Sequence, residues 1–195
     1  MLNKLRLPQP ESVLRMEGFR SQVVRDGLQH YSVLAASALY YEKQNRAELN
    51  DLRIVFYVVP FSDGATTKPI AAKEMATMPA VQEKAGNLRA DSGILYMQED
   101  SEGHKRNDMD LVGDVEYTGS DGSVIITSKM YYRDAENRLF SDEGFERRLP
   151  TDNGLLISKG KSFETNRERT VWKDTGAKIQ LVPYARQGDK NEKNP

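Results

Sequence analysis

The fold is decided by residues 107–145, NDMDLVGDVEYTGSDGSVIITSKMYYRDAENRLFSDEGF, which contain three predicted strands separated by two turns. Apolar or small residues alternate with polar ones over 108–117, the period-two pattern of a strand with one face in water. Residues 119–122 (GSDG) predict a hairpin turn, because Gly and Asp tolerate positive φ at low steric cost. β-branched and aromatic residues predict a second strand over 124–132, and DAEN turns the chain into a third over 138–140.

Segments on both sides of this stretch have the composition of further strands. They are predicted over 19–24, 30–41, 49–59, 88–97, 145–149, 155–163, 170–172 and 178–182. Segment 30–41 is ambiguous because its alanines favour a helix, but its tyrosines and the preceding DG turn favour a strand, which we adopt.

The remaining segments are polar or interrupted by proline. We expect an extended lead-in over 1–17, an insertion over 62–87 that is irregular or contains a short helix, and a disordered tail over 185–195. Residues 18–184 are expected to form a single β domain.

The composition limits the class of protein. A chain of 195 residues can form one β domain and bury a hydrophobic core. With 38% hydrophobic and 29% charged residues, a thin, elongated sheet fits better than a compact α/β enzyme. The net charge of -1 argues against binding to nucleic-acid phosphates, so no nucleic-acid partner is expected. Without cysteine, the chain has neither disulfides nor Cys-ligated metals.

The sequence gives two interpretations of where the protein resides. It has no run of 18 apolar residues, and its N-terminal region lacks the apolar centre of a signal peptide. Taken literally, this predicts a soluble cytoplasmic protein. The alternative is a chain from which an N-terminal membrane anchor has been removed.

Three strands share one spacing, in which apolar or small residues occur at positions i, i+2, i+5 and i+7. They are Val33, Ala35, Ala38, Tyr40; Leu88, Ala90, Gly93, Leu95; and Ile125, Thr127, Met130, Tyr132. A weaker copy begins at Leu155 and Ile157. Repeated strand pairs that stack edge to edge each bury an apolar face that they could not bury alone. The alternative is a chance pattern among the strands of an ordinary sandwich.

Several segments together carry a family resemblance. Gly27 closing a DG turn, VLAASALYY, LRADSG, LVGDVEYTGSDG, ITSKMYY and LLISKGKSFE resemble the LptC family of lipopolysaccharide export proteins. The wider OstA-like group also includes LptA. The resemblance covers about 19–182 and implies an all-β fold, an elongated, twisted, V-shaped antiparallel β-jellyroll with an apolar seam. Two features depart from the family: the 62–87 insertion is long, and the usual N-terminal transmembrane helix is missing.

The resemblance also implies a function. A protein of this family is a non-enzymatic, periplasmic carrier that receives lipopolysaccharide from an inner-membrane ABC transporter and passes it to an LptA-like jellyroll. It is normally anchored to the inner membrane by an N-terminal helix, which is absent from this chain. The sequence also allows a homodimer. The alternative is a β-rich periplasmic scaffold domain that binds protein partners through its sheet edges and has no lipid trough.

Strand alternation and motif position predict which residues would form the lipid-binding interior. They are Val33, Ala35, Leu49, Leu88, Ala90, Leu111, Val115, Ile125, Met130, Tyr132, Phe163, Ile179 and Leu181. Each CH₂ removed from water stabilises by about 0.8 kcal/mol, so ten shielded methylenes contribute roughly 8 kcal/mol.

The first and last strands of the chain are predicted to be open edges that bind partner sheets. The edge residues are Phe19, Ser21, Val23, Lys178, Gln180 and Val182. The family resemblance implies that the C-terminal edge meets the next jellyroll and that the N-terminal region meets the transporter. The alternative is that Pro183 and the charged tail only protect an edge.

No group of residues indicates catalysis, a metal site or a cofactor. His104 lies in a polar loop where exposure is expected, and His30 is expected to be structural or exposed. Alternation places Asp108, Asp110 and Asp114 on the water face of a strand. The motifs of nucleophilic hydrolases and nucleotide-binding loops are absent from the sequence. Trp172 is interpreted as an end-cap of the core.

Overall fold

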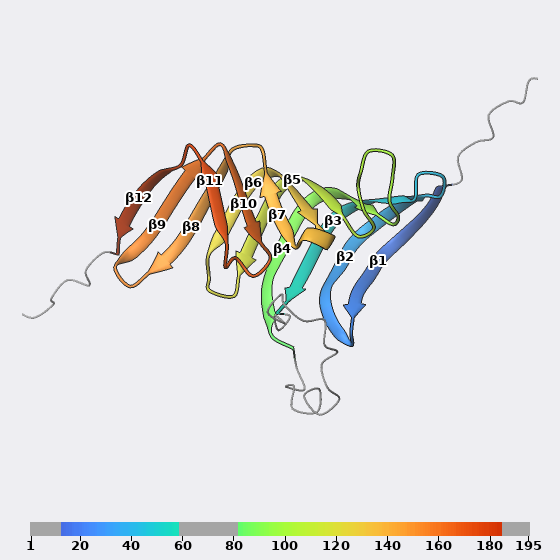
Figure 1. Ribbon diagram of the computed structural model, residues 1–195, viewed down its shortest axis with the longest axis horizontal. Helices are drawn as coiled ribbons and strands as arrows, with labels where there is room; N and C mark the ends of the chain where they lie inside the picture. The colour runs from blue at the N-terminus through green and yellow to red at the C-terminus, as the bar shows by residue number, and fades with distance from the viewer. Residues whose placement is uncertain (1–12, 59–81, 185–195) are drawn as a thin grey trace, which may run out of the picture.

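The computed structural model describes residues 13–58 and 82–184, which form one twelve-stranded antiparallel sheet. The strands are β1 (Val13–Arg25), β2 (Leu28–Tyr41), β3 (Arg46–Tyr57), β4 (Lys84–Tyr96), β5 (Met109–Gly119), β6 (Val124–Arg133), β7 (Arg138–Ser141), β8 (Phe145–Thr151), β9 (Gly154–Gly160), β10 (Ser162–Asn166), β11 (Trp172–Thr175) and β12 (Lys178–Pro183). A single 3₁₀ turn, η1 (Asp134–Glu136), separates β6 from β7. The molecule is elongated, with β1 at one end and β12 at the other (Figure 1).

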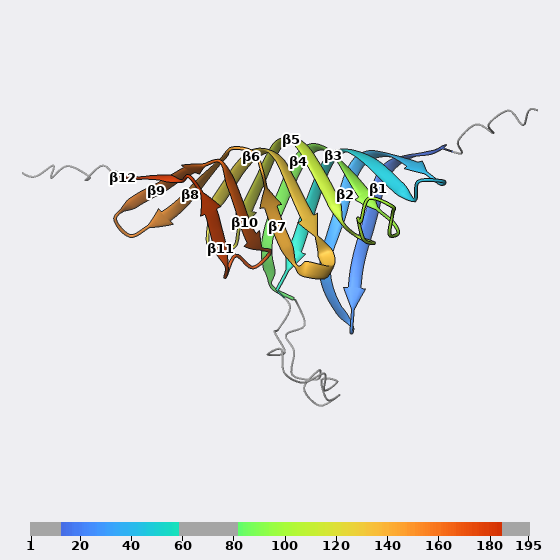
Figure 2. The ribbon, with the colours of Figure 1, turned by 45° about the horizontal axis from the view of Figure 1, so that its top comes forward.

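The sheet divides into two branches at β6. From β1 to β6 every strand pairs with the next one along the chain. Residues 124–127 of β6 then pair with β8, whereas residues 131–133 pair with β7. One branch continues from β8 to β9 and β12, and the other from β7 to β10 and β11. Beyond β6 the molecule therefore has two layers, which Figure 2 shows in a turned view.

A crease runs across β1–β6 and folds the continuous part of the sheet into a V. Cross-strand register aligns its residues in one line: Gly18, Ala36, Asp51, Asp91, Gly113 with Asp114, and Ser128. These residues are exposed except Gly113, which is half-buried. The expected V-shaped, antiparallel all-β fold is therefore confirmed, and the crease forms the base of the V.

The crease separates two walls. The β8 wall comprises residues 19–35, 52–58, 82–90 and 115–127 with β8, β9 and β12. The β7 wall comprises residues 13–17, 37–50, 92–112 and 129–133 with β7, β10 and β11. After β6 the chain passes from one wall to the other three times, which is the winding of a jellyroll.

Residue types at the crease match the backbone that the bend requires. Gly18, Asp51 and Gly113 have φ of +66°, +47° and +85°, a region that Gly enters freely and that Asp tolerates better than most residues. One extra residue enters β5 here, because its register with both β4 and β6 shifts by one at this point. The Asp91 carboxylate accepts a hydrogen bond from the Asp114 N–H at 3.2 Å, which ties β4 to β5 at the bend.

The crease explains the repeated spacing in the sequence. In a flat strand the buried residues would follow every second position, but at the crease two consecutive residues point outward. In β2, Ala35 and Ala38 are buried, whereas Ala36 is exposed and Ser37 half-buried. Each i, i+2, i+5, i+7 set therefore contributes two residues to each wall, with the three-residue step at the bend.

Aromatic rings join the two walls inside the V. Tyr132 of the β7 wall packs edge-on against Tyr31 and Phe56 of the β8 wall, at centroid distances of 5.5 and 5.1 Å. Phe56 also contacts the Tyr117 ring at 6.0 Å. All four side chains are at most 1% exposed, so the centre of the V is closely packed.

Most predicted strands are confirmed, including the ambiguous segment 30–41, which forms part of β2. Four boundaries are corrected. The predicted strand over 170–172 starts two residues too early, because β11 begins at Trp172 and pairs with β10 over 172–175. Residues 13–17 belong to β1 rather than to a lead-in, and residues 84–87 belong to β4 rather than to an insertion, because both pair with neighbouring strands. The predicted strand over 155–163 is two strands, since the chain crosses from the β8 wall to the β7 wall at Lys161. The predictions for 1–12, 62–81 and 185–195 lie outside the described residues.

Gly113→Ala is expected to destabilise the protein more than Gly103→Ala. Both glycines have positive φ, so each substitution strains the backbone by about 1–2 kcal/mol. At Gly113 the new Cβ would also overlap the Asp91 side chain, whereas at Gly103 it would meet nothing within 4 Å. We expect roughly 1–3 kcal/mol of additional loss at Gly113, measured by urea unfolding. Equal losses in the two variants would contradict the close approach at the crease.

Candidate functional site

The candidate site is the inner face of the V, the face shared by the buried side chains of both walls. Eleven of the predicted interior residues are at most 6% exposed. They are Val33, Ala35, Leu49, Leu88, Ala90, Leu111, Val115, Ile125, Met130, Tyr132 and Phe163. They belong to one cluster of buried residues, in which the side chains of the two walls fill the space between them.

Ile179 and Leu181 depart from the prediction of burial. Cross-strand register places them in line with Ser158 and Leu156 of β9, on the inner face. Their exposed fractions are nevertheless 67% and 50%. The inner face thus continues onto β12, where it is left uncovered. The predicted side of the strand agrees with the register, and the predicted burial is wrong because no opposing wall shields these two side chains.

The opposite end of the V is also less tightly closed. Met16, Phe19, Val23 and Tyr40 pack against the core but are only partly buried. All four lie on β1 or β2, the first two strands of the sheet. The inner face is therefore sealed in its middle and more accessible at both ends.

Polar contacts hold the free margins of the two walls together. Arg25, at the end of β1, forms an ion pair with Asp134 of η1, whose side chain is fully buried. Asp134 also accepts hydrogen bonds from Tyr132 Oη at 3.1 Å and Asn107 Nδ2 at 3.3 Å. Tyr31 Oη of the β8 wall donates to the Asn107 carbonyl at 3.2 Å. These contacts link the margins without any strand pairing between them.

The residues after β10 provide a second set of contacts across the margin. The Arg167 guanidinium lies 3.1 Å from His30 Nδ1, and the Arg167 carbonyl accepts a hydrogen bond from Tyr117 Oη at 2.5 Å. Burial, followed by the positive charges of Arg167 and Arg25, lowers the pKa of His30 below its usual 6.5. Burial raises the pKa of Tyr117 to about 12, so its hydroxyl stays a hydrogen-bond donor at neutral pH.

Arg169 closes the margin next to the β5–β6 turn. Its Nη1 contacts the Asp121 carboxylate at 2.5 Å and also the Ser123 hydroxyl. The Arg169 side chain is 6% exposed, whereas Asp121 is half exposed at 49%. A Cβ at Gly119 would overlap the Arg169 guanidinium, so this glycine provides the space into which the arginine fits.

An aromatic cluster with one arginine lies at the C-terminal end of the inner face. Phe163 and Trp172 of the β7 wall stack at 5.3 Å, and Phe145 of the β8 wall packs edge-on against both. The Arg147 guanidinium lies 4.3 Å from the centroid of the Trp172 ring. Trp172 therefore packs at the end of the core, as the sequence predicted, and Arg147 is an inner-face residue that the sequence analysis missed.

Open strand edges occur at three places in the described sheet. β1 pairs only with β2, β11 only with β10, and β12 only with β9. β1 and β12 contain the predicted edge residues, and every residue of β12 is exposed. In β1, Phe19 and Val23 also pack on the core, so they serve the inner face as well as the strand.

The loop between β4 and β5 corrects two expectations. The His104 ring stacks on Tyr96 at 3.9 Å and its side chain is 15% exposed, so His104 is not an exposed loop residue. Asp108 is buried rather than on the water face, because it lies 3.7 Å from Arg133 and accepts a hydrogen bond from the Asp134 N–H. Asp110 is only partly exposed, at 18%, and Asp114 is exposed as predicted.

The same loop brings three potential metal ligands together. Ligand atoms of Asp100, Glu102 and His104 lie within 4.8 Å of one another. Asp100 already accepts hydrogen bonds from the backbone N–H groups of Glu102 and His104 and contacts His104 Nδ1 at 2.8 Å. This turn is therefore explained by its internal hydrogen bonds.

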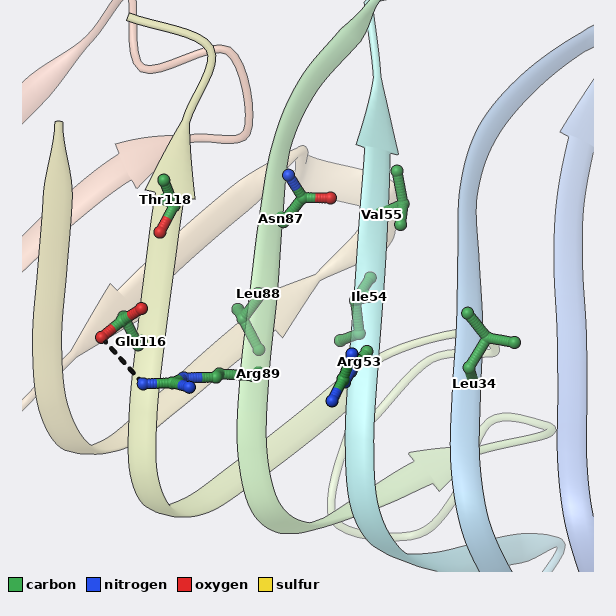
Figure 3. A pocket seen from close by; sticks show the side chains of 9 residues that line it. All are labelled: Leu34, Arg53, Ile54, Val55, Asn87, Leu88, Arg89, Glu116 and Thr118. Atoms are coloured by element: carbon green, nitrogen blue, oxygen red, sulfur yellow. Dashed lines mark hydrogen bonds and ion pairs between the residues drawn. The ribbon is translucent and has the colours of Figure 1, made fainter. Parts of the chain in front are cut away.

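A separate shallow hollow of about 560 Å³ lies on the outer face of the β8 wall. Figure 3 shows Arg53 and Arg89 on adjacent strands, with Arg89 paired to Glu116 at 3.2 Å. Leu34 and Thr118 stand at its two sides. The hollow has charged walls and lies on the side of the sheet opposite the buried core, so it does not form part of the inner face.

The signal for several missed inner-face residues was present in the sequence. β3 repeats the i, i+2, i+5, i+7 spacing at Ala47, Leu49, Leu52 and Ile54, all at most 1% exposed. Only Leu49 was predicted. No periodic pattern marks Arg147, since a charged residue on the apolar face breaks the alternation.

Comparison with solved structures finds five similar chains, one of which is described below. No protein-family model matches the chain, and no curated protein matches it. The chain is similar to LptH from Pseudomonas aeruginosa, described as the LptA-homologous periplasmic component of the lipopolysaccharide transport device. Sequence identity is 12%, the TM-score is 0.49, and the match covers 78% of this chain and 95% of that chain. Within residues 13–58 and 82–184, no helix has the length and apolar character needed to cross a bilayer.

Acidification is expected to weaken the contact between the wall margins at His30. Because the folded-state pKa of His30 is lowered, its stabilising contribution is fully present above pH 6.5 and is lost as pH falls through the lowered value. The free energy of unfolding should therefore decrease between pH 7.5 and 5, and less so in His30→Gln. An NMR titration of the His30 ring should give a pKa below 6.5. A midpoint at or above 6.5 would contradict the burial and the Arg167 contact.

Gly119→Ala is expected to displace Arg169 from its position between the walls. The new Cβ would move the guanidinium and break its contacts with Asp121 and Ser123, which predicts a loss of roughly 1–3 kcal/mol in the free energy of unfolding. Gly144→Ala is the matched control, because the nearest atom to its Cβ would be 3.7 Å away, and its effect should stay within about 0.5 kcal/mol. Urea unfolding measures both, and a neutral Gly119→Ala would show that Arg169 does not tie the margins together.

Proposed function

We propose that the protein is a non-enzymatic carrier that receives lipopolysaccharide from an inner-membrane ABC transporter and passes it to a second periplasmic jellyroll. The observation that carries the proposal is the apolar inner face, which continues beyond the packed core to Ile179 and Leu181, where it is exposed. A face that runs the length of the molecule and opens at its end gives acyl chains a continuous apolar path. The sequence resemblance to the LptC family supplies the lipid class.

Acyl chains would enter by separating the walls, and the fold makes this separation inexpensive. The crease keeps the walls joined through β1–β6, so no strand pairing within this part of the sheet has to break. The margins are held by polar contacts, most of which contribute about 1 kcal/mol each, and the contact to the buried Asp134 contributes more. An inserted acyl chain replaces side-chain contacts with equally apolar ones, and each newly buried CH₂ adds about 0.8 kcal/mol.

The open edges support the transfer step of the proposal. β1 and β12 lie at opposite ends of the molecule, and each presents an unpaired side within the described sheet (Figure 1). A second jellyroll that paired with β12 would extend the β8 wall beyond this strand. It would also cover Ile179 and Leu181, the exposed inner-face residues of β12. The lipid path and the binding edge therefore meet at one end of the molecule.

The alternative function is a scaffold domain that binds partners through its edges and admits no lipid. Close packing at the centre of the V favours it, since Leu49, Leu111 and Tyr132 are at most 1% exposed. Edge pairing by β1 and β12 would serve a scaffold equally well. The two functions differ in one measurable property, which is whether lipid reaches the inner face.

Photo-crosslinking at adjacent residues of β1 distinguishes the two functions. Benzoylphenylalanine replaces Phe19, which packs on the inner face without being fully buried, or Arg20, which lies on the outer face of the same strand. After irradiation with purified lipopolysaccharide, we expect saturable adducts at position 19 and few at position 20. The carrier is contradicted if a folded position-19 variant yields no adduct, or if both positions react equally.

A further inference from the structure

Arg147 is an inner-face cation without an acidic partner among the described residues. Its register neighbours are Ile125 on β6 and Ser158 on β9, both buried, which places its side chain on the apolar side of the β8 wall. Trp172 covers it from the other wall. Arginines placed against a core usually pair with a carboxylate, but no ion pair with Arg147 is formed within residues 13–58 and 82–184.

The two carboxylates that act on Arg147 each have another partner. Burial and the nearby Arg169 both lower the pKa of Arg147, opposed by the charges of Asp121 and Asp174. Asp121 is already paired with Arg169, and Asp174 accepts the Trp172 indole N–H at 2.8 Å. The Arg147 guanidinium stays charged, because arginine is not deprotonated in proteins.

A second polar group on the same face also lacks a partner. Ser158 lies directly opposite Arg147 on β9, is only 7% exposed, and its Oγ has no hydrogen-bond partner. A buried hydroxyl without a partner is uncommon, because leaving it unsatisfied costs roughly 1–3 kcal/mol. A guanidinium and a hydroxyl on neighbouring strands are the donors that a phosphate or carboxylate group accepts from.

Apolar residues extend from this pair toward the open end of the molecule. Ile179 follows Ser158 in register, and the next row on the same face contains Leu149, Leu156 and Leu181. We name these four residues the C-terminal shelf. Ile179 and Leu181 are exposed, and Leu149 and Leu156 are half-buried. A cation beside an exposed apolar shelf matches an amphiphile whose acidic head group is attached to acyl chains.

We infer that Arg147 and Ser158 form a binding site for the phosphate or carboxylate group of an anionic amphiphile whose acyl chain lies on the C-terminal shelf. This inference rests on the proposed carrier function and adds to it the residues that hold the acidic head group and its place on the inner face. The site selects acidic lipids over neutral ones, because a neutral head group leaves Arg147 unpaired.

Fluorescence of Trp172 tests the site directly, because it is the only tryptophan in the chain and contacts Arg147. The full chain is titrated with n-dodecyl phosphate, n-dodecyl maltoside and inorganic phosphate, with both amphiphiles below their critical micelle concentrations. We expect dodecyl phosphate to bind at least about tenfold more tightly than dodecyl maltoside, as a charge-assisted bidentate contact predicts. Inorganic phosphate should bind far more weakly than dodecyl phosphate.

Three variants and one control variant locate the selectivity. Arg147→Gln should bring the affinities for the two amphiphiles close together, and Arg147→Lys should keep part of the preference. Arg148→Gln is the matched control, since Arg148 is exposed, lies on the outer face and pairs with Glu146 at 2.6 Å. Ser158→Ala should weaken dodecyl phosphate binding by about threefold, and it tests the same site from β9 if Arg147→Gln does not fold.

The outcomes separate this inference from the carrier function. Equal binding of the two amphiphiles by the unaltered protein would overturn the acidic site and leave the carrier standing. Inorganic phosphate binding as tightly as dodecyl phosphate would overturn the lipid head group as the ligand. An unchanged preference in both Arg147→Gln and Ser158→Ala would place the selectivity elsewhere. Failure of both amphiphiles to bind would count against the carrier itself.

Discussion

A sheet that is apolar on one face and has no helix to cover it must bury that face against itself. Over residues 13–58 and 82–184 the chain offers one 3₁₀ turn and no α-helix, so the bend at the crease does what a covering helix does in other folds. At the crease, two consecutive outward residues in most of the strands β1–β6 turn the apolar face inward from both sides. The walls, the shared core and the polar margins all follow from this arrangement.

The crease also explains where unusual residues occur. Asp51 and Asp91 stand side by side on adjacent strands, an arrangement that repulsion between like charges disfavours. Both are exposed at the outer side of the bend, where water screens them, and nearby Arg53 and Arg89 supply opposite charge. Their short polar side chains suit a bend whose outer surface stays in contact with solvent.

The sequence predicted the strands of the fold better than their arrangement into walls. Local alternation identified β2 and the hairpin of β5 and β6, because residues close in sequence determine them. The spacing that begins at Val33, Leu88 and Ile125 includes the three-residue step that marks the crease. This step indicates a bend in the sheet only when the steps of neighbouring strands are known to lie side by side. The division of 155–163 depends on which wall each half pairs with, and pairing over long sequence distances leaves no local pattern.

The candidate site was predictable where it is apolar and not where it is polar. Leu49 and Met130 follow the alternation of their strands, and Ile179 follows it too, although burial requires an opposing wall that β12 lacks. Arg147 violates the alternation, so pattern reasoning would place it in water. Local rules tend to fail at sites of function, where one group is held in an environment that stability alone would not select. An arginine on an apolar face, beside a serine without a partner and at the end where that face opens, is therefore more informative about the ligand than the many residues that the pattern explained.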